Sequence, residues 1–251
     1  MSELPLAKYT DERMSERENL TSDERSELWD ALCVVEDYLG GGARRPREVL
    51  DFDAAAARAT ARSELAAPRP GDSLEAIAAE VLACRACRLC EKRSHAVPGQ
   101  GPASPAALVV GEGPGAEEDA SGLPFVGPAG KLLDKMLSSI GLSREANCFI
   151  ANVVKCRPPQ NRDPAADEQA ACIGYLRRQI ALLRPKAILC VGRIASGALL
   201  GTSEGVGKLR GKWREFEGLP ILVTYHPSAL LRDDSYKRPA WEDLKLFRER
   251  L

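Results

Sequence analysis

The sequence predicts an α/β fold: a three-layer αβα domain around a short four-stranded parallel sheet, preceded by an N-terminal helical or disordered extension. Two observations support this prediction. Short apolar runs alternate with amphipathic stretches through the last two thirds of the chain, which is typical of a parallel sheet covered on both faces. A loop with six glycines and three prolines, residues 111–130, follows the first apolar run. Open α/β sheets place ligand sites in loops at the carboxyl ends of their strands.

The first 73 residues form an acidic extension. Residues 1–24 are polar and are expected to be disordered. Apolar side chains at helical spacing predict a helix over about 28–38, which ends at three consecutive glycines. Residues 39–71 are rich in Ala, Arg, Pro and Asp and are interpreted as a flexible linker. The helix of this extension could dock on the rest of the chain or bind another protein.

The domain proper is predicted to cover residues 74–251. A helix start at Asp72-Ser73-Leu74-Glu75 leads a helix towards Cys84. Four strands are then expected, each followed by a helix, with right-handed crossovers. The predicted strands are 107–111, 148–153, 187–191 and 220–224, and the predicted helices are 129–140, 164–183, 193–200 and 239–250.

The charge of the chain is unevenly divided. Residues 1–83 carry 10 basic and 18 acidic side chains, whereas residues 84–251 carry 25 basic and 18 acidic ones. A basic part hidden in a nearly neutral chain favours contact with a polyanion, although two solvated surfaces would give the same counts. No signal peptide and no long apolar run is found, so we expect a cytoplasmic protein without membrane contact. We also expect a monomer.

Four of the eight cysteines have the spacing of ligands. Cys84 and Cys87 form a Cys-x₂-Cys pair, and Cys156 and Cys172 follow far downstream. Four thiolates suit either zinc or an iron–sulfur cluster, and the spacing does not choose between them. Cys90 could compete as a ligand. The other cysteines, Cys33, Cys148 and Cys190, lie in apolar patterns and are expected to be buried packing residues.

Two polar residues lie where predicted strands end. Asn152 leaves the second strand, and its amide can donate and accept at once, which suits the edge of a nucleobase. His226 follows the fourth strand and lies at the same edge of the sheet, where a functional role is favoured over a structural one. The other histidine, His95, is expected at the surface.

With these residues identified, the chain resembles the family 4 uracil-DNA glycosylases, the iron–sulfur bacterial and archaeal type. The resemblance covers about residues 74–251 and rests on ordered motifs. These are Cys84-x-x-Cys87, Gly111–Gly130, Asn152–Arg162, Cys172, Lys208–Trp213 and His226–Arg232. It implies the three-layer fold and a [4Fe–4S] cluster on Cys84, Cys87, Cys156 and Cys172. Because the chain lacks the features of relatives that trap DNA covalently, an ordinary turnover enzyme is expected. The N-terminal extension would then be a candidate contact for a replication or repair protein.

The resemblance also implies how the site works. The enzyme would flip uracil out of DNA, at a cost of a few kcal/mol, and hydrolyse its N-glycosidic bond. The base would stack on Phe125, and Asn152 would read its polar edge. Glu118 would exclude the thymine methyl group. A neutral His226 would donate to the uracil oxygen. Glu112 would position or polarise the water, and the Gly113 backbone would shape the pocket.

DNA contacts are expected from basic side chains and one apolar wedge. The basic candidates are Lys155, Arg157, Arg162, Lys208, Arg210, Lys212 and Arg232. Leu230 is placed to fill the emptied base stack, with ordinary loop packing as a nearly equal interpretation.

Two other classes of protein compete with the enzyme. One is a non-catalytic iron–sulfur nucleic-acid-binding module of the same fold, against which the presence of Glu112, Asn152 and His226 argues. The other is a zinc-stapled, flavodoxin-like nucleotide-binding protein, which would need a phosphate loop that the sequence does not show.

Overall fold

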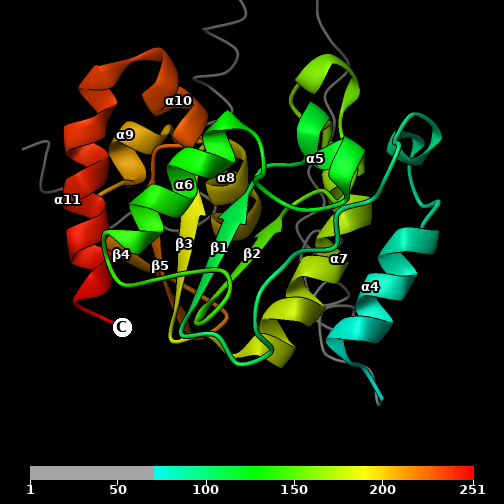
Figure 1. Ribbon diagram of the computed structural model, residues 1–251, viewed down its shortest axis with the longest axis horizontal. Helices are drawn as coiled ribbons and strands as arrows, with labels where there is room; N and C mark the ends of the chain where they lie inside the picture. Colours follow the sequence, from blue (N-terminus) through cyan, green and yellow to red (C-terminus); the bar gives the residue numbers. More distant parts are fainter. Residues whose placement is uncertain (1–70) are drawn as a thin grey trace, which may run out of the picture. The chain divides into compact units, whose positions relative to one another are not determined.

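The computed structural model describes residues 71–251, which form an α/β domain (Figure 1) around one five-stranded sheet. The predicted helix 28–38 and the linker lie outside the described residues. The strands are β1 (Ala107–Gly111), β2 (Cys148–Asn152), β3 (Ala187–Val191), β4 (Trp213–Phe216) and β5 (Leu219–Thr224). They lie in the order β2-β1-β3-β5-β4. All neighbouring pairs are parallel except β4 with β5.

The four predicted parallel strands are confirmed, and one edge strand was missed. β4 pairs antiparallel with β5 from Trp213↔Leu222 to Phe216↔Leu219. Its two central residues, Arg214 and Glu215, are exposed. Because only one of its four side chains is fully buried, the apolar signal of this strand is weak.

Helices cover both faces of the sheet and make three layers (Figure 1). One face packs against α6 (Pro128–Ser138), α10 (Pro227–Arg232) and α11 (Lys237–Arg248). The other packs against α4 (Leu74–Ala83), α7 (Ala166–Leu183), α8 (Arg193–Leu200) and α9 (Val206–Leu209). Successive residues of β1 alternate between the two cores, as the pleat of a strand requires. Among the described residues, no helix is long and apolar enough to cross a membrane.

Two ion pairs anchor the start of the domain. Ser73 caps α4 by accepting a hydrogen bond from the backbone N–H of Ala76. The buried guanidinium of Arg178 on α7 pairs with Asp72 just before α4 and with Glu80 within it. These contacts hold α4 against α7, so the segment that follows α4 enters the domain at a defined place.

The register of the sheet brings the polar strand ends together. Gly111, the last residue of β1, lies opposite Asn152, the last residue of β2. β2 lies on one side of β1, and β3, which comes later in the chain, lies on the other side. This reversal of strand order opens a crevice at the carboxyl ends, where such sheets bind ligands. The Gly/Pro-rich loop after β1 differs from the prediction in one respect, because it contains a short helix, α5 (Ala116–Ser121).

Candidate active site and cysteine cavity

A cleft of about 990 Å³ lies at the carboxyl edge of the sheet. It is lined by the segments that follow β1, β2, β3 and β5, and by α9. The structure therefore brings together loops that are up to about half the chain apart in sequence. The predicted site residues that line it are Glu112, Gly113, Glu118, Phe125, Asn152, Arg162, His226 and Arg232.

Asn152 has an unused hydrogen-bonding atom in this cleft. Its side chain is 1% exposed, and its Oδ1 has no hydrogen-bond partner. A buried carbonyl oxygen without a partner costs about 1–3 kcal/mol, so such atoms are rare unless a ligand satisfies them. A Cβ built on Gly111 would lie 2.5 Å from Asn152 Oδ1 and 2.5 Å from Phe125 Cζ. The amide and the aromatic ring therefore converge on one spot, which the glycine leaves open.

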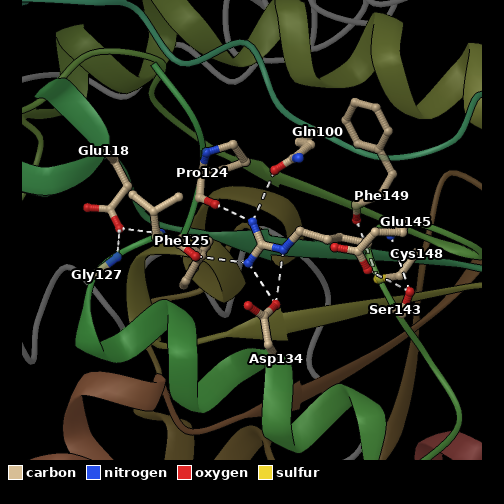
Figure 2. A network of polar contacts seen from close by, with 12 residues as sticks. Gln100, Glu118, Pro124, Phe125, Gly127, Asp134, Ser143, Glu145, Cys148 and Phe149 are labelled. Carbon is tan, nitrogen blue, oxygen red and sulfur yellow. Dashed lines mark hydrogen bonds and ion pairs between the residues drawn. The ribbon is translucent and has the colours of Figure 1, made fainter. Parts of the chain in front are cut away.

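Arg144 fixes the backbone that carries Phe125, and Figure 2 labels its partners Gln100, Pro124, Phe125 and Asp134. Its buried guanidinium donates to the carbonyl oxygens of Pro124 at 2.7 Å and Phe125 at 2.8 Å. It also donates to Asp134 on α6 and to Gln100. Phe125 has a φ of 52°, a left-handed conformation that a bulky residue adopts only when its surroundings impose it. Arg144 supplies that constraint, and no sequence pattern had marked this residue.

Replacing Gly111 by alanine is expected to reduce any activity of the cleft about 100-fold or more. The added methyl group would displace Asn152 and Phe125 together, and misplacement by about 1 Å can cost a factor of about 100 in rate. Gly174→Ala is the matched control, because its Cβ would meet nothing within 4 Å. Activity measured beside thermal unfolding would check this. Equal activity in the two variants would contradict it.

His226 is held as a neutral donor. Its Nδ1 accepts from the backbone N–H of Ser228 at 3.1 Å, so the proton of the neutral ring resides on Nε2. Burial, with the nearby charge of Arg232, lowers the pKa of His226 to about 4. Its ring centroid lies 5.6 Å from that of Phe125. Near neutral pH an uncharged N–H donor thus stands beside the aromatic ring.

The carboxyl group of Glu112 has a raised pKa. Burial, and then the charge of Asp163, raise the pKa of Glu112 to about 7, although Arg193 opposes the shift. Asp163 and Arg193 line the same cleft and form an ion pair at 2.5 Å. Neither was predicted as a site residue. Arg193 could have been recognised as a candidate from the sequence, because it directly follows Gly192 at the end of the third strand.

Glu118 connects the two ends of the loop after β1. Its carboxylate accepts from the backbone N–H groups of Gly115, Val126 and Gly127 at 2.8–3.0 Å. Figure 2 shows the contact with Gly127. This carboxylate is also close enough to oppose the lowering of the pKa of His226. Glu118 therefore shapes the wall beside Phe125, while exclusion of a methyl group by Glu118 stays a prediction.

Five cysteines line a second, smaller cavity between α4, α7 and the segment after β2. They are Cys84, Cys87, Cys90, Cys156 and Cys172. Nitrogen donors point at three of the sulfurs: Arg93 Nη1 lies 3.0 Å from Cys156 Sγ, the N–H of Lys155 lies 3.2 Å from Cys172 Sγ, and the N–H of Ala86 lies 3.5 Å from Cys84 Sγ. Such donors stabilise thiolates that ligate a metal centre. Among residues 71–251, no group of three His, Cys, Asp or Glu side chains is close enough to hold a single metal ion.

Comparison with known proteins identifies the family. A family model described as the uracil DNA glycosylase superfamily matches residues 98–245. The type-4 uracil-DNA glycosylase of Saccharolobus solfataricus is 45% identical over 189 residues, which is 72% of this chain and 87% of the relative. That of Thermotoga maritima is 41% identical over 176 residues, 68% of this chain and 91% of the relative. The chain belongs to the uracil-DNA glycosylase superfamily.

Two residues of this glycosylase homologue that were predicted to contact DNA are buried in the structure. Lys155 is 1% exposed and donates to Gln179 Oε1 at 2.7 Å, so its ammonium group is held inside the protein. Burial lowers the pKa of Lys155 to about 8. Leu230 is 3% exposed and belongs to the core beneath α10. Its neighbour Leu231 is 52% exposed and takes its place as the candidate wedge.

The other basic candidates differ in their surroundings. The guanidinium of Arg210 donates hydrogen bonds to the carboxylate of the buried Asp243 at 2.9 and 3.0 Å. Arg162 makes two hydrogen bonds to Glu168, and Arg157 donates to Asn161. Lys208, Lys212 and Arg232 are exposed. Arg162 and Arg232 line the cleft, and the role of all these side chains in DNA binding stays a prediction.

Cys148 and Cys190 are fully buried, as predicted, and Cys33 lies outside the described residues.

Proposed function

We propose that this protein is a DNA repair glycosylase that flips uracil out of DNA and hydrolyses its N-glycosidic bond, leaving an abasic site. The observation that carries the proposal is the buried, unpartnered Oδ1 of Asn152 beside Phe125 and His226. A uracil ring offers an N–H for this oxygen, an aromatic face for Phe125, and a carbonyl oxygen for the histidine.

The chemistry follows from the charges that develop. When the bond between the sugar C1′ and the base N1 breaks, its electron pair stays on uracil and the sugar becomes cationic. His226 Nε2–H donates to the uracil oxygen on which negative charge grows, and such a donor is worth about 3 kcal/mol in the transition state. Glu112, as a carboxylate, stabilises the cationic sugar and positions the water whose oxygen adds to C1′. The proton that this water loses balances the one that the departing uracil anion takes up.

The cysteine cavity supports a [4Fe–4S] cluster held by Cys84, Cys87, Cys156 and Cys172. Sulfur donors with N–H groups directed at them are the surroundings that such clusters use. When bound, the cluster would supply a covalent tie between three segments of the fold. In this proposal no reaction step passes through it.

The proposal is tested with an oligonucleotide that carries one uracil. Incubation followed by alkali should break the strand at the uracil with wild type and not with His226→Ala. Failure of cluster-loaded wild type to break any strand would favour the second candidate, a non-catalytic DNA-binding module of the same fold. Binding of the oligonucleotide without excision would identify that module.

The rate of excision is expected to rise with pH and to level off above about pH 7. Glu112 acts as a carboxylate, and with a pKa of about 7 it loses its charge as the pH falls below that value. His226, with a pKa of about 4, stays neutral across this range and adds no inflection. Single-turnover rates between pH 5 and 9 would check this. A Glu112→Gln variant should be slower and pH-independent, and an unchanged profile in that variant would contradict the assignment.

Replacing Leu231 by alanine is expected to slow excision from duplex DNA about tenfold and from single strands less than threefold. A wedge is needed only where a base leaves a stack, and unstacking costs a few kcal/mol. Leu82→Ala is the control, because Leu82 is 56% exposed on α4, which does not line the cleft. An equal loss on both substrates would show that Leu231 does not fill the stack.

A further inference from the structure

The cleft extends well beyond the residues assigned to uracil. Its volume of about 990 Å³ is at the upper end of the range of about 300–1,000 Å³ for pockets that bury a whole drug-sized molecule. A single pyrimidine ring is smaller than such a molecule. The cleft therefore has room for more of the substrate than one flipped base.

Two tyrosines that the proposed uracil site does not use also line this cleft. Tyr225, directly before His226, and Tyr236, in the 3₁₀ turn Asp234–Tyr236, both line the cleft and are half-buried. Their rings stack with centroids 4.4 Å apart and an interplanar angle of 25°. The proposed chemistry at uracil uses neither ring, because Phe125 supplies the aromatic face there.

Small groups and the exposed Arg232 also line the cleft. Val206 and Gly207 of α9 also line it, and a Cβ on Gly207 would lie 3.7 Å from Tyr225 Oη. Arg232 is exposed, lines the cleft, and lies close enough to lower the pKa of His226. None of the described acidic residues forms an ion pair with it. Arg232 and the tyrosine pair therefore line the same cleft. A cation can hold the phosphate of a nucleotide, and an aromatic ring can hold its base.

We propose that Tyr225, Tyr236 and Arg232 form a second nucleotide subsite, which holds the base next to uracil on the same DNA strand. The base stacks on the tyrosine pair, and Arg232 contacts the phosphate that joins the two nucleotides. This inference rests on the proposed glycosylase function and adds to it a binding determinant outside the uracil pocket. Stacking tolerates every base, so the subsite would favour a neighbour without selecting its identity.

The test varies Tyr236, which is ten residues away from His226 in sequence. Tyr236→Leu keeps apolar bulk and removes the aromatic face, and Tyr236→Phe is the matched control that keeps the ring. Three single-stranded oligonucleotides are compared, with uracil internal, at the 5′ end, or at the 3′ end. Each terminal substrate lacks one neighbour. Excision kinetics and fluorescence anisotropy are measured for each, and thermal unfolding checks the fold.

The expected result is a rise in KM of about tenfold for Tyr236→Leu on internal uracil, with kcat within about twofold. The same variant should show no loss on the one terminal substrate that lacks the stacked neighbour, and Tyr236→Phe should match wild type. Equal losses on all three substrates would indicate a structural role only and would overturn the subsite. So would the absence of any loss.

The outcomes separate this inference from the proposed function. If wild type excises uracil and Tyr236→Leu shows no substrate dependence, the subsite is wrong and the glycosylase stands. If wild type excises nothing, anisotropy still decides about stacking, because Tyr236→Leu should then weaken binding of the internal and only one terminal oligonucleotide. Equal binding by Tyr236→Leu and Tyr236→Phe would overturn the proposed subsite.

Discussion

Asn152→Ala is expected to lower the single-turnover rate of uracil excision by about 10³-fold or more, without lowering the melting temperature. The amide oxygen has no partner within the fold, so its removal costs the folded state no hydrogen bond. The substrate, in contrast, loses the group that pairs with its polar edge. Sites built to hydrogen-bond a substrate discriminate by factors of about 10⁴–10⁵ when one partner is missing.

Asn147→Ala is the matched control and should behave in the opposite way. Asn147 Oδ1 accepts from the N–H of Ser143 at 2.8 Å, and its Nδ2 donates to the carbonyl of Gly141 at 3.0 Å. This residue precedes β2, at the end of the strand remote from the cleft. Its replacement should lower stability by about 1–2 kcal/mol and leave the rate per folded molecule unchanged. Loss of stability in Asn152→Ala with full activity would remove Asn152 from the site.

The sequence was sufficient to predict the parts of the site that interrupt a regular pattern. Asn152 and His226 are polar residues at the ends of apolar runs, and parallel strands carry such ends to one edge. The two-core arrangement also followed from the alternation of strands and helices. These features are local in the chain and repeat with a known period, which is why they could be located without a structure.

The direction of individual side chains could not be predicted from the sequence. Lys155 follows Val153 and Val154 and remains inside the protein, where Gln179 satisfies its ammonium group. Leu230 and Leu231 are equivalent in the sequence, and only the phase of α10 decides which of them is exposed. A helix of six residues is too short for its apolar period to be recognised.

Residues that act through tertiary contacts could not be recognised in the sequence. Arg144 lies in a turn, and its partners Gln100, Pro124 and Asp134 come from separate segments. β4 was missed for the same reason, because its pairing with β5 rather than its composition makes it a strand. Distant hydrogen bonds of this kind determine the shape of the cleft, and a single sequence does not contain them as a pattern.

Cys172→Ala is expected to remove iron from the purified protein, to abolish absorption near about 400 nm, and to lower the free energy of unfolding by about 3 kcal/mol or more. Cys172 is on α7, Cys156 follows β2, and Cys84 and Cys87 follow α4. A cluster on these four sulfurs ties together segments up to 88 residues apart in sequence. For a domain of this size, a loss of 3 kcal/mol corresponds to about 6–12 °C in melting temperature.

Two further cysteines make this prediction specific. Cys190→Ala removes a fully buried sulfur from β3, outside the cavity, and should cost about 1 kcal/mol while leaving iron and absorption intact. Cys90→Ala removes the fifth cysteine of the cavity and should also retain iron if the other four are the ligands. If Cys172→Ala retained iron and Cys90→Ala lost it, Cys90 would be the ligand in place of Cys172. Zinc in place of iron in the wild type would overturn the cluster.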